Sequence, residues 1–402
     1  MLTLIEGGHV FRPEAVGSPS ILFVNERIEK IGRVSRRALD ELGCEYDVID
    51  AEDCYVTPGI IDPHQHLLGR SGEGSLALQS PMLFLTEIIR AGITTVVGTL
   101  GVDTTMKTLP GLLARVKALT EEGISARMWS GGYNIPPVTI TGSIRTDMLF
   151  IDECVGYGEV AISDERSLQT SMDELARHVM DAHIGGLLSG KAGLTHFHVG
   201  DGRNRLEPLR ELLENYEIKP DFLYPTHIGR TPEVIAEAVG LAREGCYVDI
   251  DVVERDLAKT SRIYLQSGGP PDRLTVSSDS DSSTPDILYD QLCGLVVKQK
   301  MPLELMLSFV TSNTAKALKL DQKGRLDEGK DADILVLRRG SLEIVEVIAR
   351  GKRMVRDGSV VVREKFLEES SRDVTLTGAR FDPSTAGQLS DSHRAGNRST
   401  GN

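Results

Sequence analysis

The stretch PGIIDPHQH, residues 58–66, begins the region whose pattern decides the fold. An apolar run follows the break near Pro58 and ends in two histidines one residue apart. Short β-rich runs of this kind recur at intervals long enough to hold a helix and its connections. They are GIIDPHQH, ITTVVGTLG (Ile93–Gly101), SARMWSGGY (Ser125–Tyr133), EVAIS (Glu159–Ser163), LTHFHVGD (Leu194–Asp201), DFLYPTHI (Asp221–Ile228), CYVDIDV (Cys246–Val252) and LTVSSDSD (Leu274–Asp281).

The segments between these runs mostly show helical periodicity, as in LPGLLARVKALTEEG and TPEVIAEAVGLAREG. Several of the helical patterns stop at a glycine, at Gly92, Gly123 and Gly245. Eight strand–helix units in a row predict an α/β fold, a (β/α)8 barrel of the TIM type over residues 58–324. A doubly wound open sheet is the alternative.

The two ends of the chain have a different texture. Residues 1–57 and 325–368 carry short β-like pieces separated by turn residues. These pieces predict one small β-sandwich built from both termini. Residues 369–402 are polar, and the part after Phe381 is nearly free of large apolar groups, so this tail is expected to be disordered.

Composition excludes some classes of function. The net charge of −14 argues against nucleic-acid binding, because a surface that binds phosphates is normally basic. No apolar stretch is long enough to span a bilayer, and the start lacks the features of a signal peptide. The five cysteines are scattered, which indicates free thiols in a reduced compartment. We therefore expect a cytoplasmic protein without a membrane partner.

Polar residues gather where the predicted strands end, and catalysis in such barrels occurs at the carboxyl ends of the strands. His64 and His66 lie two residues apart on a strand and so share a face. The histidines and carboxylates at these strand ends can together hold one or two divalent metals. Imidazole nitrogens and carboxylate oxygens suit Zn²⁺, at distances of about 2.0–2.2 Å from the ion. The candidate ligands are His64, His66, Glu159, His198, His227 and Asp279.

Each histidine taken alone is more often structural than a metal ligand, since histidine is commonly half-buried. Four of the nine histidines nevertheless fall at ligand positions. His196 also forms a His-x-His pair with His198 and competes for the role. We favour His198 because it lies nearer the strand end and precedes a Gly-Asp turn.

The motifs PGIIDPHQHLLGRSGEG, LTVSSDSDSS and GRLDEGKDADILVL resemble the amidohydrolase superfamily. The blocks ITGSIRTD, AISDERS, GGLLSGKAGLTHFHVGDG and FLYPTHIGRTPEV are similar to those of bacterial isoaspartyl dipeptidases. The resemblance extends from about residue 3 to residue 365. It implies hydrolysis of a β-aspartyl peptide bond, by attack of a metal-bound hydroxide on the amide carbonyl, at a binuclear zinc centre.

The resemblance also implies roles for single residues. It makes His64, His66, His198, His227 and Asp279 metal ligands and gives substrate contacts to Glu73, Tyr133, Arg166, Arg230 and Ser283. Asp279 would act as general base and then acid, and Tyr133 would stabilise the oxyanion. Glu73 would bind the substrate ammonium, and the two arginines a carboxylate. The plain alternative for Arg166 is a surface salt bridge.

The chain departs from the family at the bridging ligand, which is usually a carboxylated lysine. Glu159 occupies that position, and no lysine occurs between Lys117 and Lys191. A carboxylate can bridge two cations, so we predict that Glu159 bridges two zinc ions. A site with one zinc is the alternative.

Two further departures concern the substrate. Val102 replaces a threonine that helps to hold the substrate carboxylate, and Ser71, beside Arg70, replaces a glycine. Losing a hydroxyl donor can cost about 1–3 kcal/mol. The amidase reaction is thus predicted more firmly than the dipeptide.

Three classes of function remain open. The first is an isoaspartyl dipeptidase, and the second is a related amidase, either a cyclic-amide hydrolase of the dihydroorotase or hydantoinase type or an N-acyl amino acid deacylase. The third is a non-catalytic assembly protein. Glu73, Tyr133 and the arginines favour the first, because they provide for an amine and a carboxylate together. We expect a small dipeptide substrate and a homo-oligomer.

Overall fold

The structure is a computed structural model that describes residues 2–41, 43, 45–253, 256–368 and 370–371. Its contacts divide the chain into two units, Met1–Glu364 and Lys365–Asn402. In the second unit the described residues include one short helix, η4 (Lys365–Leu367). The tail predicted to be disordered lies almost wholly outside the described residues.

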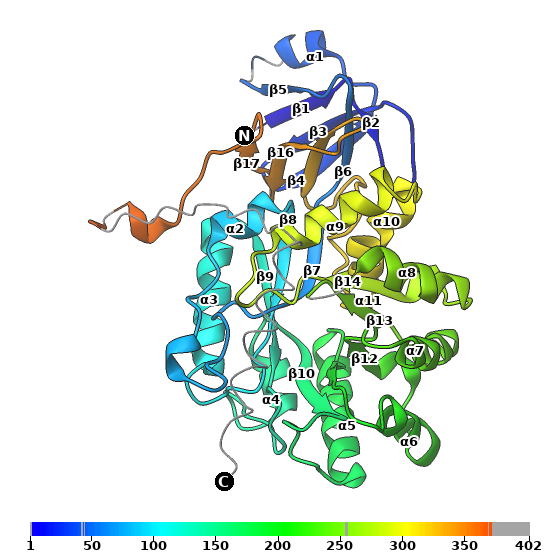
Figure 1. The fold of residues 1–402 in the computed structure, drawn as a ribbon. Helices are drawn as coiled ribbons and strands as arrows, with labels where there is room; N and C mark the ends of the chain where they lie inside the picture. The colour runs from blue at the N-terminus through cyan, green and yellow to red at the C-terminus, as the bar shows by residue number, and fades with distance from the viewer. Residues whose placement is uncertain (1, 42, 44, 254–255, 369, 372–402) are drawn as a thin grey trace, which may run out of the picture. The chain divides into compact units, whose positions relative to one another are not determined.

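Eight parallel strands of the larger unit make up a barrel, and helices lie around them (Figure 1). Six of them pair in chain order, and the last two pair with each other. They are β7 (Ile60–Gln65), β8 (Ile93–Gly98), β9 (Ser125–Ser130), β10 (Cys154–Ile162), β11 (Leu194–Val199), β12 (Leu223–Thr226), β13 (Val248–Asp251) and β14 (Leu274–Ser277).

The ring closes at two seams. At the end of β7 and just beyond the end of β14, a parallel bridge joins Gln65 to Ser280. Backbone bonds run from His66 N to Ser280 O and from Asp279 N to His64 O, both of 3.0 Å. At the β12–β13 seam, Ile228 N donates to Asp249 O at 3.3 Å. The predicted TIM-type barrel is therefore confirmed, and the open-sheet alternative is wrong.

The barrel strands are buried on both faces, because side chains fill the interior and helices cover the outside. The interior is partly polar. The indole of Trp129 donates to Pro63 O at 3.0 Å, and Tyr224 and Asp249 lie in the same buried layer. The strand predicted over Glu159–Ser163 is longer than expected, since β10 begins at Cys154. Glu159 therefore lies inside a strand and not at its end.

Helices follow the strands and begin and end where the sequence signals lie. Thr108 caps the helix that contains Pro110, and Gly123, with φ of 120°, ends it. Among the described residues no helix is long and apolar enough to cross a membrane. The helices of this region are α2 (Leu85–Arg90), α3 (Leu109–Glu122), α4 (Ile144–Phe150), α5 (Met172–Ser189), α6 (Glu207–Asn215), α7 (Pro232–Glu244), α8 (Leu257–Gln266), α9 (Asp286–Val297), α10 (Leu303–Val310) and α11 (Ser312–Ala317), with the short helices η1 (Leu76–Leu78), η2 (Pro220–Phe222) and η3 (Pro271–Arg273).

The two ends of the larger unit supply two further sheets, and in Figure 1 strands in blue and in orange lie side by side. Strand β6 pairs antiparallel with β15, from Pro58–Ile334 to Cys54–Arg338. Apolar side chains of both sheets share one buried cluster. One sheet has the order β4 (Arg27–Gly32), β3 (Ser20–Val24), β1 (Leu2–Glu6), β5 (Asp47–Asp50), and the other the order β18 (Ser359–Val360), β17 (Lys352–Arg356), β16 (Ile344–Ala349), β15 (Ile334–Arg338), β6 (Cys54–Pro58), β2 (His9–Val10); α1 (Arg36–Glu41) precedes β5. The domain limits at 57/58 and 324/325 stay a prediction.

The described cysteines are free, as expected. Cys54, Cys154 and Cys246 are buried and Cys293 is half-buried, whereas Cys44 lies outside the described residues. Burial raises the pKa of the Cys154 thiol to about 12. These thiols are therefore packing groups in their neutral form.

A buried lysine connects the barrel to the strands of the chain ends. Lys323 Nζ donates to Ser125 Oγ, at the start of β9, and to Asp333 Oδ2, just before β15, both at 2.6 Å. Asp331 Oδ2 lies 2.7 Å away on the same ammonium. Because all three charged groups are largely removed from water, each one depends on the others.

Lys323→Met keeps most of the side-chain volume but leaves the buried carboxylate of Asp333 without a cation and that of Asp331 with Arg27 alone. We expect the free energy of unfolding to fall by about 3–5 kcal/mol, as when one partner of a buried ion pair is removed. Denaturant unfolding followed by circular dichroism measures the change. The exposed Lys316→Met on α11 is the matched control, and equal stability of the two variants would contradict the assignment.

Candidate active site

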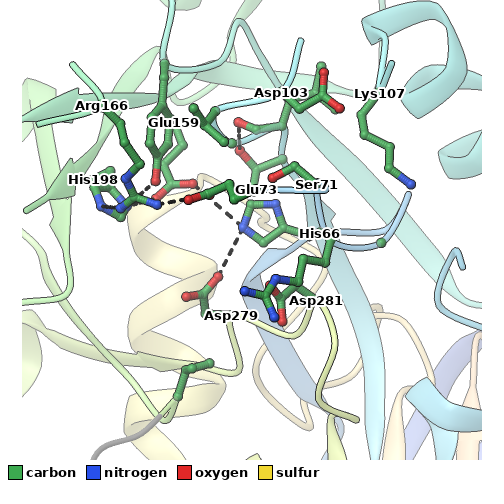
Figure 2. A pocket seen from close by; sticks show the side chains of 18 of the residues that line it. His66, Ser71, Glu73, Asp103, Lys107, Glu159, Arg166, His198, Asp279 and Asp281 are labelled. Carbon is green, nitrogen blue, oxygen red and sulfur yellow. Dashed lines mark hydrogen bonds and ion pairs between the residues drawn. The ribbon is translucent and has the colours of Figure 1, made fainter. Parts of the chain in front are cut away.

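A cavity of about 250 Å³ opens at the carboxyl ends of the barrel strands (Figure 2). His198 comes from β11 and Glu159 from β10, whereas His66, His227 and Asp279 follow the ends of their strands. All five line the cavity. His64 is fully buried beneath it, near the end of β7.

Two of these residues have an unusual backbone. The φ angles of His227 and Asp279 are 63° and 47°, in the left-handed region that non-glycine residues seldom adopt. His227 directly follows β12, and Asp279 lies two residues after the end of β14. Local backbone strain of this kind is common at functional sites.

The imidazoles and carboxylates converge on one another. His64 Nε2 lies 3.2 Å from Asp279 Oδ1 and 3.3 Å from Glu159 Oε2. His66 Nε2 lies 3.1 Å from Asp279 Oδ1, and His227 Nε2 lies 3.3 Å from Glu159 Oε1. Three overlapping groups have ligand atoms within 4.8 Å of one another: His64, His66 and Asp279; His64, Glu159 and His227; and His227, Asp251 and Asp279.

Unpartnered atoms in this cluster show that a cation fits it. His64 Nδ1, His64 Nε2 and Glu159 Oε2 are buried and make no hydrogen bond of good geometry among the described residues, although His64 Nε2 faces the carboxylates of Glu159 and Asp279. Buried polar atoms are normally satisfied, so these atoms need a further partner. Imidazole nitrogens and carboxylate oxygens are ligands for divalent metals. The cluster can therefore hold a metal.

The ionisation of the cluster is set by its own charges. Burial alone would lower the pKa of His64, but the carboxylates of Asp279 and Glu159 outweigh it and raise this pKa to about 9. Burial would raise the pKa of Glu159, but His64 and His198 hold it well below its usual range. The carboxylates are thus ionised at neutral pH, and a cation that binds must displace protons from imidazoles.

His198 and His196 occupy different environments. His198 Nδ1 lies 2.8 Å from Glu159 Oε1 and 2.6 Å from the Tyr133 hydroxyl, and the ring lines the cavity. His196 is fully buried in the barrel interior, stacked on Trp129, with Nδ1 3.2 Å from Tyr224 O. Only His198 of this pair faces the cavity, although it belongs to none of the three groups above.

The residues predicted to contact substrate line the cavity, with one exception. Glu73 Oε1 lies 3.2 Å from Arg166 Nη1, and Arg230 Nη1 lies 3.1 Å from Asp201 Oδ2. Arg166 lines the cavity and also forms the ion pair with Glu73 (Figure 2). Ser283 is not among the lining residues. The lining also includes Tyr133, Ser71, Val102 and Arg70.

Tyr133 is buried beside the cluster. Burial, with the carboxylate of Glu159, raises the pKa of its phenol well above 10. The hydroxyl therefore keeps its proton at neutral pH and can donate a hydrogen bond into the cavity.

Sequence reasoning missed two carboxylates. Asp251 Oδ2 lies 2.8 Å from His227 Nδ1, and Asp164 Oδ2 lies 3.0 Å from His198 Nε2. Burial would raise the pKa of Asp164, but hydrogen bonds from Arg166 and His198 hold it well below its usual range. Asp251 ends the seventh barrel strand, so the strand-end rule that selected the other ligands could have found it.

Comparison with known proteins identifies the family and the fold. Residues 272–354 match the amidohydrolase family. The chain is 33% identical to a crystal structure of a beta-aspartyl dipeptidase from Fervidobacterium islandicum AW-1, covering 94% of this chain and 100% of that one, with a TM-score of 0.85. The same dipeptidase in complex with beta-Asp-Leu has a TM-score of 0.84. A D-hydantoinase structure, 17% identical with a TM-score of 0.63, shares the fold over 90% of this chain and 97% of that one.

Curated relatives carry a different name. The chain is 24% identical to adenine deaminase 1 of Latilactobacillus sakei, over 79% of this chain and 52% of the relative. It is also 24% identical to an adenine deaminase of Thermosipho melanesiensis, over 91% of this chain and 63% of the relative. The chain thus spans about half to two thirds of the length of these relatives.

Asp251→Asn removes the charge that orients His227 and leaves the ring without a strong acceptor. We expect affinity for a divalent metal to fall about 10–100-fold, as is typical when the partner of a ligating histidine is changed. Competition with a chromophoric chelator measures the affinity. The exposed Asp290→Asn on α9 is the matched control, and unchanged affinity in Asp251→Asn would contradict the role of His227 as a ligand.

Proposed function

Since the chain belongs to the amidohydrolase superfamily, we propose that it hydrolyses the amide bond of β-aspartyl (isoaspartyl) dipeptides with the help of bound metal. The observation that carries this proposal is the charge pattern around the cluster. A carboxylate, Glu73, and two guanidiniums, Arg166 and Arg230, line one cavity of about 250 Å³. A β-aspartyl dipeptide offers an ammonium and carboxylates to match them.

Binding would replace existing ion pairs. Glu73 and Arg166 are 3.2 Å apart in the free protein, so each carries a partner that a substrate group can displace. The substrate ammonium would pair with Glu73, and a substrate carboxylate would form bidentate ion pairs with the two arginines. These contacts would place the scissile amide over Glu159 and Asp279.

The chemistry would then depend on a proton carrier and an oxyanion donor. The neighbouring imidazoles hold the pKa of Asp279 below its usual range despite burial, so it is ionised and can take a proton from the attacking water. It would pass that proton to the leaving amine. Tyr133, which stays protonated, would donate to the oxyanion.

Residues of the cluster would hold the metal, which we propose is zinc. His64, His66 and Asp279 form one half, His198 and His227 the other, and Glu159 lies between them. A bound cation supplies Lewis-acid polarisation of the scissile carbonyl and acidifies the attacking water. We propose two zinc ions bridged by Glu159, with a single ion as the alternative.

The residues that line the cavity leave the second candidate function, a related amidase, as an alternative. Val102, Arg70 and Ser71 all line the cavity, at the positions where the chain departs from the family pattern. A hydrophobic side chain at position 102 offers no hydrogen bond to a substrate carboxylate. A cyclic amide or an N-acyl amino acid needs fewer such bonds.

Purified protein supplied with zinc is expected to release leucine from β-Asp-Leu and to leave α-Asp-Leu, hydantoin, N-acetyl-aspartate and adenine intact. Removing metal with a chelator should abolish the activity, and zinc should restore it. Glu73→Gln should raise KM more than it lowers kcat, because the ammonium loses its counter-ion. Chromatographic detection of products measures each reaction. Turnover of another substrate in this panel in place of β-Asp-Leu would refute the proposed specificity, and no turnover with no bound metal would indicate an assembly protein.

Metal analysis tests the bridge. The wild-type protein is expected to bind two zinc ions per chain, and Glu159→Gln to retain one or fewer, because an amide bridges two cations poorly. Inductively coupled plasma mass spectrometry after gel filtration counts the ions. One tightly held zinc ion in both proteins would rule out bridging by Glu159.

A further inference from the structure

The second ring nitrogen of His198 has an environment that the proposed reaction leaves unexplained. His198 Nε2 lies 3.0 Å from Asp164 Oδ2, 3.0 Å from Arg166 Nη2 and 3.3 Å from Arg230 Nη2. The ring and the carboxylate are both more than nine-tenths buried. Among these three neighbours only Asp164 can accept a hydrogen bond, since a guanidinium has no acceptor.

The neighbours of Nε2 therefore compete over the tautomer. A neutral imidazole carries its proton on one nitrogen and a lone pair on the other. If Nε2 carries the proton, it donates to Asp164. Nδ1 then offers a lone pair that the Tyr133 hydroxyl, 2.6 Å away, can donate to and that a cation beside Glu159 can accept. If an arginine donates to Nε2, the ring proton is on Nδ1. An N–H then points into the cluster, and Nδ1 cannot bind a metal because it has no free lone pair.

The same carboxylate also fixes Arg166. Asp164 Oδ1 accepts from the backbone N of Arg166 at 2.8 Å and from its Nε at 2.9 Å, and Oδ2 accepts from Nη2 at 2.9 Å. The two bonds from Nε and Nη2 set the plane of the guanidinium, and the bond from the backbone N fixes the chain beside it. Its remaining nitrogen, Nη1, is directed to Glu73 at 3.2 Å.

We propose that Asp164 is a positioning residue that selects the Nε2–H tautomer of His198 against the two arginines and aims Arg166 into the cavity. One carboxylate thereby couples the metal cluster to the recognition of the substrate carboxylate. The proposal rests on the proposed function in one respect, that His198 is a metal ligand and Arg166 contacts substrate. Asp251 differs from Asp164. Among the described residues, His227 is the only side chain that Asp251 binds, and it has no arginine partner there.

Nuclear magnetic resonance reads the tautomer directly. In zinc-loaded, full-length protein labelled with ¹⁵N-histidine, the His198 ring should show a proton on Nε2 and a coordinated Nδ1. The signal is assigned by its loss in His198→Gln. Coordination through Nε2, with the proton on Nδ1, would overturn the proposal, and this measurement needs no variant of Asp164.

Zinc affinity separates positioning from a general structural role. Asp164→Ala should weaken zinc binding about 10–100-fold, and Asp164→Asn, which keeps an acceptor oxygen, should weaken it less. Arg166→Gln alone should leave zinc affinity unchanged. The double variant Asp164→Ala/Arg166→Gln should bind zinc more tightly than Asp164→Ala, because one competing donor is gone.

Several results would contradict the proposal. Unchanged zinc affinity in Asp164→Ala, an equal loss in Arg166→Gln, or losses that add in the double variant would each overturn it. Asp201→Ala is the matched control, since it removes the exposed carboxylate beside Arg230 without contact to His198 in the described structure. Thermal unfolding of every variant identifies any that fail to fold.

Kinetics complete the test. Asp164→Ala and Arg166→Gln should both raise KM for β-Asp-Leu, whereas Asp251→Asn at saturating zinc should not. If the KM of Asp164→Ala equals that of the wild type, the proposed effect of Asp164 on Arg166 is contradicted. Zinc affinity and the tautomer of His198 do not depend on the substrate. If the variants show the predicted zinc affinities but the protein does not hydrolyse β-Asp-Leu, the proposed specificity is refuted. The proposed role of Asp164 is then still supported.

Discussion

The closing seam of the barrel, between β7 and β14, is the constraint on which the site depends. The backbone bonds that close the ring, from Asp279 N to His64 O and from His66 N to Ser280 O, belong to residues of the cluster itself. Asp62 reinforces the seam, because its Oδ1 accepts from the backbone N of His64 and of Ser278. The barrel therefore cannot close without bringing His64, His66 and Asp279 together.

Closure has an electrostatic consequence. It removes Glu159 and Asp279 from water next to several imidazoles, and burial would disfavour every one of these charges alone. The charges are retained because they stabilise one another, as the raised pKa of His64, to about 9, and the depressed pKa of Glu159 show. Among the described residues no cationic side chain pairs with Asp62, and burial raises its pKa to about 6. The cluster thus contains buried ligand atoms that make no good hydrogen bond among the described residues, and a metal can bind to them.

Much of the fold could be predicted from local patterns. Strand and helix periods gave eight units, and capping residues such as Thr108 and glycines such as Gly123 mark helix ends in the structure as in the sequence. The strand-end rule brought His64, His66 and Asp279 to one place. It failed for Glu159, which lies inside β10, because local periodicity does not fix where a buried strand begins. Ser283, which the resemblance predicted as a substrate contact, lies outside the cavity lining, since the path of a loop depends on what it packs against.

The order of strands and helices, the chemical types of the candidate ligands and the resemblance to the family can all be read from the sequence. These properties follow from short-range periodicity and from residue identity. The partner of each ligand became visible in the folded chain: Asp251 for His227, and Asp164 shared between His198 and Arg166. Hydrogen bonds reach about 3 Å, and whether two side chains from different strands come that close depends on the closure of the whole ring.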